Sequence, residues 1–417
     1  MSAYEQLFRQ LDEVGTLSRG KSKHRPRNDP ILYGGPHPFI QTGDVKHSSF
    51  YVTSYSQTYS DKGLAQSKLW PAGTLCITIA ANIADTAILT FPACFPDSII
   101  GFKAKDGVAS TAYVKYCLDT YKTQMRSISQ GTTQDNLSQG KLLSLKFRIP
   151  DFQTQQKIAA ILSAYDDLIA NNQRRITLLE RMAEDIYREW FVRLRFPGHE
   201  QVTIQKNIPQ GWRFAELSEM ATINSSSLKK GSERDRIQYI DISAVSTNHI
   251  AELAEIALAD APGRARRLVK HGDVIWSSVR PANRAYCLIY EPPKNLVAST
   301  GLAVISPKPG IPFTFINFAV TSDSYVEQMA MVAKGSAYPA TSFDDFGKAK
   351  VLRPSADLLE RFHALCEPMF RRRHQLRKTN TALAQQRDAL LPRLISGKLA
   401  VDGLDIRFPP GMAPPAP

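Results

Sequence analysis

Two stretches of the chain, about 200 residues apart, alternate apolar and small polar residues in the same way. Residues 75–89 and residues 274–289 each predict short strands separated by turns, the second of them around Pro281. Each stretch leads, through a mixed segment, to about 40 residues in which apolar side chains recur every three or four positions. That spacing predicts a long helix with one apolar face.

The apolar positions predict how the two long helices are stabilised. They are Ile158, Ile161, Tyr165, Leu168, Leu179, Met182 and Ile186 in the first helix, and Phe362, Leu365, Met369, Leu376, Leu383 and Leu390 in the second. Because a long helix with an apolar face is unstable alone in water, we expect the two to pack as an antiparallel coiled coil. The alternative is that each helix folds back onto its own globular part. Asp151 is the predicted N-cap of the first helix, and Pro368 and Pro392 are expected to kink or interrupt the second.

The similarity between the two halves indicates an internal duplication. The segment from Gly131 to Pro150 matches that from Gly335 to Pro354 at an offset of 204 residues, and the helix patterns continue at this offset. Two upstream blocks match at offsets of 200 and 199 residues: Phe39–Val45 with Tyr239–Val245, and Leu69–Ile77 with Leu268–Trp276. Chance explains one such match, but four blocks in the same order indicate a repeated unit.

These patterns predict an α+β fold with two pseudo-symmetric mixed α/β domains separated by two long helices. The predicted segments are a first domain at 1–150, a central helix at 151–196, a second domain at 197–354, a C-terminal helix at 355–400 and a tail at 401–417.

The balance of charge favours a polyanionic partner. The chain has 52 Lys and Arg against 39 Asp and Glu, a net charge of +13, which favours nucleic acid over the alternatives of a solubility charge or an anionic membrane. Its five cysteines form no C-x-x-C pair, and the sequence contains no apolar run of the roughly 20 residues that span a bilayer. We therefore expect a cytoplasmic protein that does not bind a membrane.

One segment formally matches a phosphate-binding loop. Residues 15–22 fit the G-x-x-x-x-G-K-[ST] pattern, which binds nucleotides only between a buried strand and a helix. Residues 4–14 instead predict a helix, and residues 23–30 cannot form one. The segment is better interpreted as a flexible basic loop, although a DNA-acting NTPase of the P-loop type is kept as an alternative.

Other catalytic patterns are absent from the sequence. The eight histidines lack metal-ligand spacing, and neither H-E-x-x-H nor G-x-S-x-G occurs. The paired carboxylates Asp166–Asp167 and Asp344–Asp345 are interpreted as solvated side chains, on the first long helix and in a loop respectively. We expect no catalytic residue, no metal site and no bound cofactor in this chain.

Five short segments resemble the specificity subunit of type I restriction-modification enzymes. They are Pro38–Val45, Ile208–Trp212, Trp276–Pro281, Ala298–Val304 and Leu394–Leu399. The resemblance implies two target recognition domains that each recognise one half of a split double-stranded DNA site, with the helices fixing the gap. It further implies two modification (methyltransferase) subunits that carry S-adenosylmethionine, and restriction/translocase subunits that use ATP and Mg. A non-specific basic coiled-coil scaffold is the remaining alternative.

Candidate DNA contacts are donors, acceptors and cations on loops held by a scaffold. In the first domain they are Lys21, Lys23, Arg25, Arg27, Gln41, Thr42, Lys46, Thr132, Thr133 and Gln134. In the second domain they are Lys229, Lys230, Arg234, Arg236, Arg280, Arg284, Ser336 and Tyr338.

Overall fold

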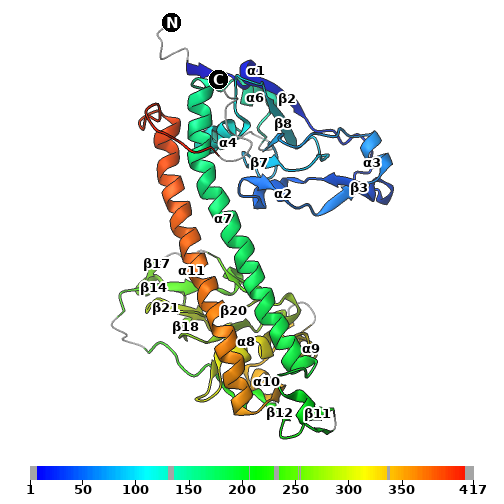
Figure 1. The fold of residues 1–417 in the computed structure, drawn as a ribbon, viewed down its shortest axis with the longest axis vertical. Coiled ribbons are helices and arrows are strands. Elements are labelled where there is room, and N and C mark those ends of the chain that lie inside the picture. The colour runs from blue at the N-terminus through cyan, green and yellow to red at the C-terminus, as the bar shows by residue number, and fades with distance from the viewer. Residues whose placement is uncertain are drawn as a thin grey trace. The chain divides into compact units, whose positions relative to one another are not determined.

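The computed structural model describes residues 7–129, 136–205, 207–229, 234–251, 253, 255–335 and 339–408. The chain forms two compact units, unit 1 with Met1–Asn172 and Lys378–Pro417, and unit 2 with Gln173–Arg377. These units differ from the predicted segments because both long helices, α7 (Phe152–Tyr187) and α11 (Ala356–Ile395), contribute one part to each unit (Figure 1).

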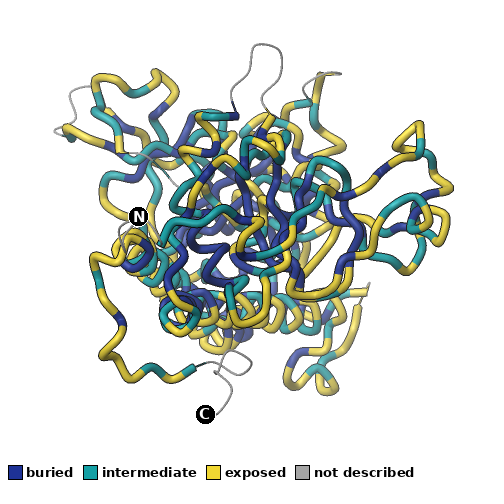
Figure 2. The backbone as a smooth tube through the Cα atoms, turned by 90° about the horizontal axis from the view of Figure 1, so that it is seen from above, coloured by how far each residue is buried: buried dark blue, intermediate teal, exposed yellow. Residues whose placement is uncertain are grey.

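Unit 1 is built on a five-stranded sheet in the order β2-β8-β6-β7-β4. The strands are β2 (Gly15–Arg19), β4 (Tyr51–Val52), β6 (Leu75–Thr78), β7 (Thr86–Leu89) and β8 (Ile99–Ala104). All residues of β6 and β7 are buried, as expected of central strands (Figure 2). They confirm the short strands predicted within residues 75–89, and they pair antiparallel.

Unit 2 repeats this arrangement in the four-stranded order β13-β22-β19-β20. Its strands are β13 (Ala221–Ile223), β19 (Val274–Ser277), β20 (Tyr286–Leu288) and β22 (Leu302–Pro307). The strands β19 and β20 confirm the short strands predicted within residues 274–289 and pair as an antiparallel hairpin, and β22 and β13 follow in the positions of β8 and β2. The matching topology confirms the internal duplication.

The helices that cover the sheets are duplicated as well. Unit 1 has α4 (Thr111–Thr120), α5 (Lys122–Ser129) and α6 (Gln139–Leu143), and unit 2 has α8 (Phe313–Thr321), α9 (Asp323–Val332) and α10 (Phe343–Lys348). Ser138 and Ser342, 204 residues apart, are the N-caps of α6 and α10, and each hydroxyl accepts a backbone N–H of the first turn. The short pairs β1 (Phe8–Arg9) with β9 (Phe147–Arg148) and β12 (Arg213–Glu216) with β23 (Lys350–Arg353) then lead into α7 and α11.

A second, smaller layer distinguishes the two units. In unit 1 it holds β3 (Tyr33–Phe39), α2 (Thr42–His47), β5 (Gln57–Tyr59) and α3 (Asp61–Ala65), with β3 and β5 paired. In unit 2 it is a sheet in the order β17-β14-β21-β18, formed by β14 (Arg236–Ile240), β17 (Glu255–Ala257), β18 (Ala265–Leu268) and β21 (Leu296–Ser299). The predicted match of residues 39–45 with residues 239–245 is visible in the pairing of these segments. Phe39 forms a parallel β-bridge with Cys94, and β14, which contains Tyr239, pairs in parallel with β21. Unit 2 also contains the small hairpins of β10 (Ile204–Gln205) with β11 (Ile208–Pro209) and β15 (Val245–Ser246) with β16 (His249–Ile250).

The long helices begin and end close to the predicted residues. The Asp151 carboxylate accepts the Thr154 N–H at 2.9 Å, which confirms it as the N-cap of α7. A single π-helical turn, Arg188–Val192, follows α7, and Gly397 with φ of +76° follows the end of α11. The expected interruption of the second helix at Pro368 and Pro392 is wrong, because α11 runs continuously from Ala356 to Ile395.

The predicted apolar face is wrong at three positions. Leu168 and Met182 are each 51% exposed and Leu365 is 45% exposed, whereas the next residues are less exposed: Ala183 and Cys366 are buried and Ile169 is half-buried. At each of these places two apolar residues are adjacent in the sequence. Either of them fits a spacing of three or four residues from the previous apolar position of the helix. Only the packing of the helices decides between them.

Three other expectations need correction. The helix predicted at residues 4–14 is a helical turn, α1 (Leu11–Val14), preceded by β1. Asp344 and Asp345 lie in the first turn of α10, not in a loop. The formal phosphate-loop motif begins in strand β2, and the described residues between β2 and Asp29 contain no helix that could receive a phosphate, which supports its rejection.

Within the described residues, no helix is long and apolar enough to cross a membrane, and no group of three His, Cys, Asp or Glu side chains could hold a metal ion.

Candidate nucleic-acid interface

The basic loop after β2 is held in a defined conformation in unit 1. The Gln66 side-chain oxygen accepts the Lys23 N–H at 2.5 Å and the His24 N–H at 3.1 Å, and the Arg25 guanidinium donates to the Ser22 and His24 carbonyls at 2.8 Å. The Tyr33 hydroxyl closes the loop by donating to the Arg27 carbonyl at 2.7 Å. This network differs from the predicted flexible loop, because backbone groups of the loop bond to side chains from distant segments.

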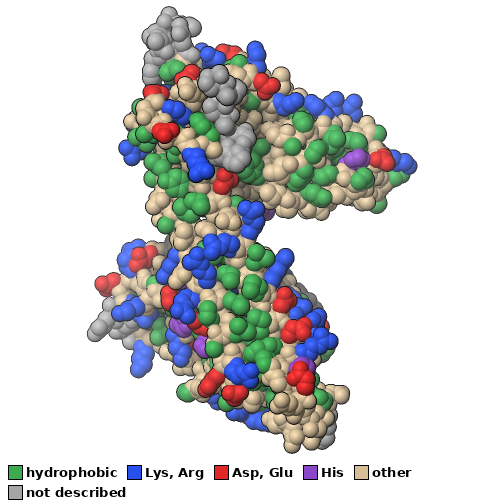
Figure 3. Space-filling model, viewed as in Figure 1, with side chains coloured by type: hydrophobic (Ala, Val, Ile, Leu, Met, Phe, Trp, Pro, Cys, Tyr) green, Lys and Arg blue, Asp and Glu red, His purple; other side chains and the backbone are tan. Residues whose placement is uncertain are grey.

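The cations of this loop differ in how far their charge is compensated. Arg27 forms an ion pair with Asp97 at 2.9 Å, whereas Lys21, Lys23 and Arg25 are exposed. Figure 3 shows a row of Lys and Arg side chains along the edge of unit 1 between β2 and α3. The sequence prediction of a basic surface here is consistent with this arrangement, but Arg27 must exchange Asp97 for any other anion.

Two lysines that the sequence did not single out lie near Lys21. The Ser67 hydroxyl donates to the Lys21 carbonyl at 2.8 Å, and the adjacent Lys68 reaches the Ser18 hydroxyl on β2 at 3.2 Å. Lys103 lies on β8, which pairs with β2. Burial lowers the pKa of Lys68, and the like charges of Lys21 and Lys103 lower it further. We call Lys21, Lys68 and Lys103 the lysine patch.

A glycine on β8 positions the lysine patch. Gly101 lacks a side chain, and a Cβ there would lie 2.6 Å from the Trp70 ring, which therefore packs directly on the strand. The Lys68 ammonium lies 3.6 Å from the centre of the Trp70 ring, in cation–π contact. The patch was missed because its members come from three separate segments, and no local motif connects them.

The other candidates of unit 1 lie at the start of α2. Gln41 precedes this helix and is hydrogen-bonded to Asp44 and, through its side-chain amide, to Gln57 at 2.6 Å. Thr42 is half-buried, and Lys46 is exposed on the last turn. Thr132, Thr133 and Gln134 lie outside the described residues.

In unit 2 the candidates are distributed over three segments. Lys229 is exposed, and Arg236 on β14 pairs with Glu255, its guanidinium donating to the Glu255 carbonyl at 2.9 Å. Arg234 is half-buried two residues before β14. Arg280 and Arg284 lie on the turn between β19 and β20, and Arg284 pairs with Asp323 at 2.6 Å. Lys230, Ser336 and Tyr338 lie outside the described residues.

Polar contacts fix the register of the helix pair inside each unit. In unit 1 Asn172 donates to Asn380 at 2.9 Å, and Asp166 accepts the Tyr116 hydroxyl at 2.5 Å and forms an ion pair with Arg387. Asp166 is buried, so its prediction as a solvated side chain is wrong. The periodic pattern could not show this, because its partners come from α4 and α11.

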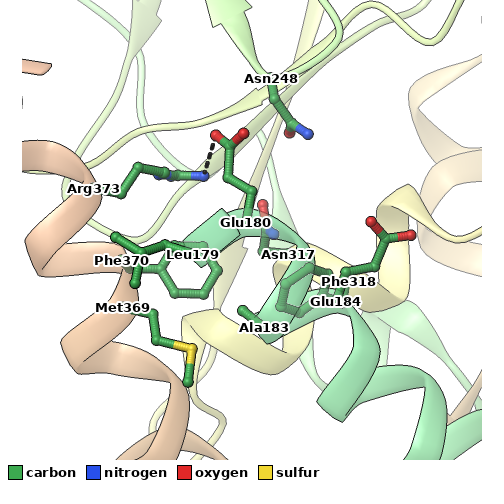
Figure 4. A pocket seen from close by; sticks show the side chains of 10 residues that line it. All are labelled: Leu179, Glu180, Ala183, Glu184, Asn248, Asn317, Phe318, Met369, Phe370 and Arg373. Carbon is green, nitrogen blue, oxygen red and sulfur yellow. Dashed lines mark hydrogen bonds and ion pairs between the residues drawn. The ribbon is translucent and has the colours of Figure 1, made fainter. Parts of the chain in front are cut away.

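In unit 2 a polar contact joins Glu180 on α7 to Arg373 on α11 at 3.4 Å (Figure 4). Glu180 also pairs with Arg377 at 3.0 Å. Burial lowers the pKa of the Arg373 guanidinium, as does the charge of Arg377, and the carboxylate of Glu180 opposes this shift. Residue numbers rise along α7 as they fall along α11, from Asp166–Arg387 to Asn172–Asn380 in unit 1 and from Glu180–Arg377 to Tyr187–Phe362 in unit 2. The paired segments are therefore antiparallel.

Comparisons with known proteins agree with this architecture. Residues 4–181 match the family model of the type I restriction modification DNA specificity domain. The chain is 24% identical to the type I restriction enzyme MjaIX specificity subunit of Methanocaldococcus jannaschii, over 95% of this chain and 94% of that protein. It is also 24% identical to the HindI specificity subunit of Haemophilus influenzae, over 32% of this chain and 30% of that protein.

A solved structure shares the fold. The crystal structure of a type I restriction-modification S subunit from M. genitalium superposes with a TM-score of 0.59 at 16% identity, covering 93% of this chain and 95% of that one. The matched domain is a DNA specificity domain of the restriction-modification class, and the chain shares the fold of that S subunit. Residues 4–181 belong to the family of the type I restriction modification DNA specificity domain, and over most of its length the chain is similar to a type I specificity subunit, which confirms the resemblance inferred from the sequence.

This similarity supports a non-catalytic role in DNA sequence recognition, within a type I system that has partner subunits.

Proposed function

We propose that each unit recognises one half of a split DNA site and that the paired long helices determine the gap between the halves. The observation that carries this proposal is the repeated sheet order, β2-β8-β6-β7 in unit 1 and β13-β22-β19-β20 in unit 2. A duplicated scaffold supports two equivalent binding modes, and the second layers, which differ between the units, would give each unit its own base sequence.

The partners and cofactors extend this proposal. Two modification subunits would dock on the chain and bind S-adenosylmethionine, and restriction subunits would use ATP and Mg. The isolated chain is then expected to transfer no methyl group from labelled S-adenosylmethionine to DNA. Methyl transfer by the purified chain, free of the modification subunit, would contradict this division of labour.

An exchange of one recognition unit tests the proposal of two independent half-sites. Replacement of residues 1–150 by the corresponding segment of another specificity subunit leaves α7 intact, since that helix begins at Phe152. We expect the methylated sequence to change in one half while the other half and the gap are retained. Sequencing of methylated genomic DNA measures both halves, with the unaltered chain as the reference. A change in both halves would be evidence against two independent readers.

The lysine patch is predicted to contribute to the sequence-independent, salt-dependent part of the affinity for DNA. Each contact between a cation and a phosphate contributes about 0.9 to the slope of log affinity against log salt. The triple variant Lys21→Gln, Lys68→Gln and Lys103→Gln is therefore expected to lower that slope by up to about 2.7, with the preferred sequence unaltered. Filter binding at several salt concentrations measures the slope for the complex with its partner subunits.

The control for this variant removes charge without touching the patch. Lys62, Lys294 and Lys348 are exposed lysines elsewhere in the chain, and their triple replacement by Gln makes the same change in net charge. If the control lowered the slope as much as the patch variant, the patch would contribute only through net charge and not through local contacts.

A further inference from the structure

Both units contain a strained turn at the same place in the sheet. Residues 79–85 connect β6 with β7, and residues 278–285 connect β19 with β20. Three residues after the first strand, Ala81 has φ of +60° and Arg280 has φ of +49°. Two residues before the second strand, Ala84 has φ of +64° and Arg284 has φ of +55°.

Left-handed backbone is unfavourable for residues other than glycine, and it persists only where the surroundings impose it. None of these four positions is a glycine. The left-handed conformation occurs at two matching positions in both copies. The turn conformation is therefore retained in the duplication despite its unfavourable free energy. The turn with residues 79–85 is called turn 1, and that with residues 278–285 is called turn 2.

Similar hydrogen bonds hold both turns, although the strand-end hydroxyl donates to the fourth residue after it in the first turn and to the second residue after it in the other. The Thr78 hydroxyl, at the end of β6, donates to the Asn82 carbonyl, and the Ser277 hydroxyl, at the end of β19, donates to the Val279 carbonyl at 3.0 Å. The carbonyl of the first turn residue accepts an N–H from the segment before the next short helix, from Leu137 in unit 1 and from Thr341 in unit 2. The two turns are therefore equivalent parts of the duplicated fold.

An ion pair attaches each turn to the neighbouring helix, with opposite polarity in the two units. In unit 1 the anion is on the turn, and Asp85 contacts Lys122 at 2.5 Å and Arg126 at 3.5 Å, both on α5. In unit 2 the cation is on the turn, and Arg284 contacts Asp323, the first residue of α9. Reversal of the charges shows that the attachment of the turn is retained while the residues that supply it differ.

Despite this reversal, both turns have cationic side chains at the surface. At turn 1 an open polar cavity is lined by Lys46, Asn82, Asp85 and Arg126. The Asp85 side chain is 9% exposed, whereas Lys122 and Arg126 are 38% and 54% exposed, so the cations face solvent and the anion lies beneath them. Turn 2 itself carries Arg280, which is exposed, and Arg284, which pairs with the carboxylate of Asp323.

We propose that turns 1 and 2 are equivalent contacts for the sugar–phosphate backbone of DNA, one in each unit. Lys46 and Arg126 would contact a phosphate at turn 1, and Arg280 with Arg284 would do so at turn 2. This proposal rests on the proposed function and adds the element that positions the duplex in each unit. Contacts to phosphates fix register without selecting a sequence, which explains why the turn is duplicated while the second layers differ.

The proposal is tested by the salt dependence of DNA binding in the full chain with its modification subunits. The variants are Lys46→Gln with Arg126→Gln at turn 1, and Arg280→Gln with Arg284→Gln at turn 2. Each pair is expected to lower the slope of log affinity against log salt by up to about 1.8, with the methylated sequence unchanged. The matched control, Lys62→Gln with Lys294→Gln, removes two exposed charges elsewhere and is expected to leave the slope nearly unchanged.

Because Arg126 also donates to the Ile83 carbonyl at 3.0 Å, its replacement could disturb turn 1. Lys46→Gln alone keeps that bond and is expected to lower the slope by about 0.9. Suppose that Lys46→Gln and the double variant Arg280→Gln with Arg284→Gln both keep the wild-type slope, and that the complex still discriminates between specific and random duplexes. This result would overturn the inference about the turns and leave the proposed function standing. If the wild-type complex did not discriminate between these duplexes, the proposed function would fail and the inference with it.

Discussion

The Asp166→Ala variant is expected to destabilise unit 1 by about 3–5 kcal/mol, the usual cost of leaving one member of a buried ion pair without its partner. Asp166 is buried, and it accepts the Tyr116 hydroxyl and pairs with Arg387. Removal of the carboxylate leaves the guanidinium without this anion and the hydroxyl without this acceptor. Hydrogen exchange followed by mass spectrometry measures the loss separately for peptides of each unit.

Two further variants separate the charge from the packing at this site. Asp167→Ala changes the exposed neighbour, and we expect an effect within about 0.5 kcal/mol. The double variant Asp166→Leu with Arg387→Met replaces the pair by apolar side chains and should recover most of the stability, because buried ion pairs contribute little net free energy over apolar packing. If Asp166→Ala cost no more than Asp167→Ala, the contact would have no structural role.

The Trp276→Ala variant should destabilise unit 2 by about 3–5 kcal/mol. Trp276 is 0% exposed on β19, stacks on Tyr286 with ring centres 5.6 Å apart and donates its indole N–H to the Val320 carbonyl at 3.1 Å. The truncation leaves a cavity at the centre of the sheet and an acceptor without its donor. Because Trp190 and Trp212 also pack in the core of unit 2, fluorescence during urea unfolding still reports on that unit.

Phe214→Ala serves as the control for this substitution. Phe214 is in the same unit but is 61% exposed on β12, so its truncation should alter stability by about 0.5 kcal/mol at most. Equal shifts of the urea midpoint in the two variants would show that burial at β19 does not determine the stability of unit 2.

Much of the fold could be predicted because its signals are local or repeated. The alternation of apolar and small polar residues located the strands β6, β7, β19 and β20, and the offset of about 200 residues predicted the equivalence of the two strand regions. Asp151 could be assigned as an N-cap because capping depends on three or four adjacent residues. The absence of a helix after the formal phosphate loop followed in the same way from the composition of residues 23–30.

The candidate interface was predicted less completely. Lys21 and Arg280 were recognised because they lie in obviously basic or turn-forming segments. Lys68, Lys103 and Arg126 were not, since each acquires its surroundings only when strands and helices from distant segments pack together. A sequence gives the number of cations. It does not show which of them form an ion pair with a carboxylate of the same chain, as Arg27 does with Asp97.

By itself, the sequence determined the duplication, the two long helices, the basic character and the family resemblance, because each is a property of residue order and composition. The tertiary structure decided which apolar residue of an adjacent pair is buried, as at Met182 and Ala183. It also decided that Asp166 is a buried partner of Arg387, and that two turns of different sequence share one strained conformation. These features depend on contacts between segments far apart in the chain, whose free energy no local pattern contains.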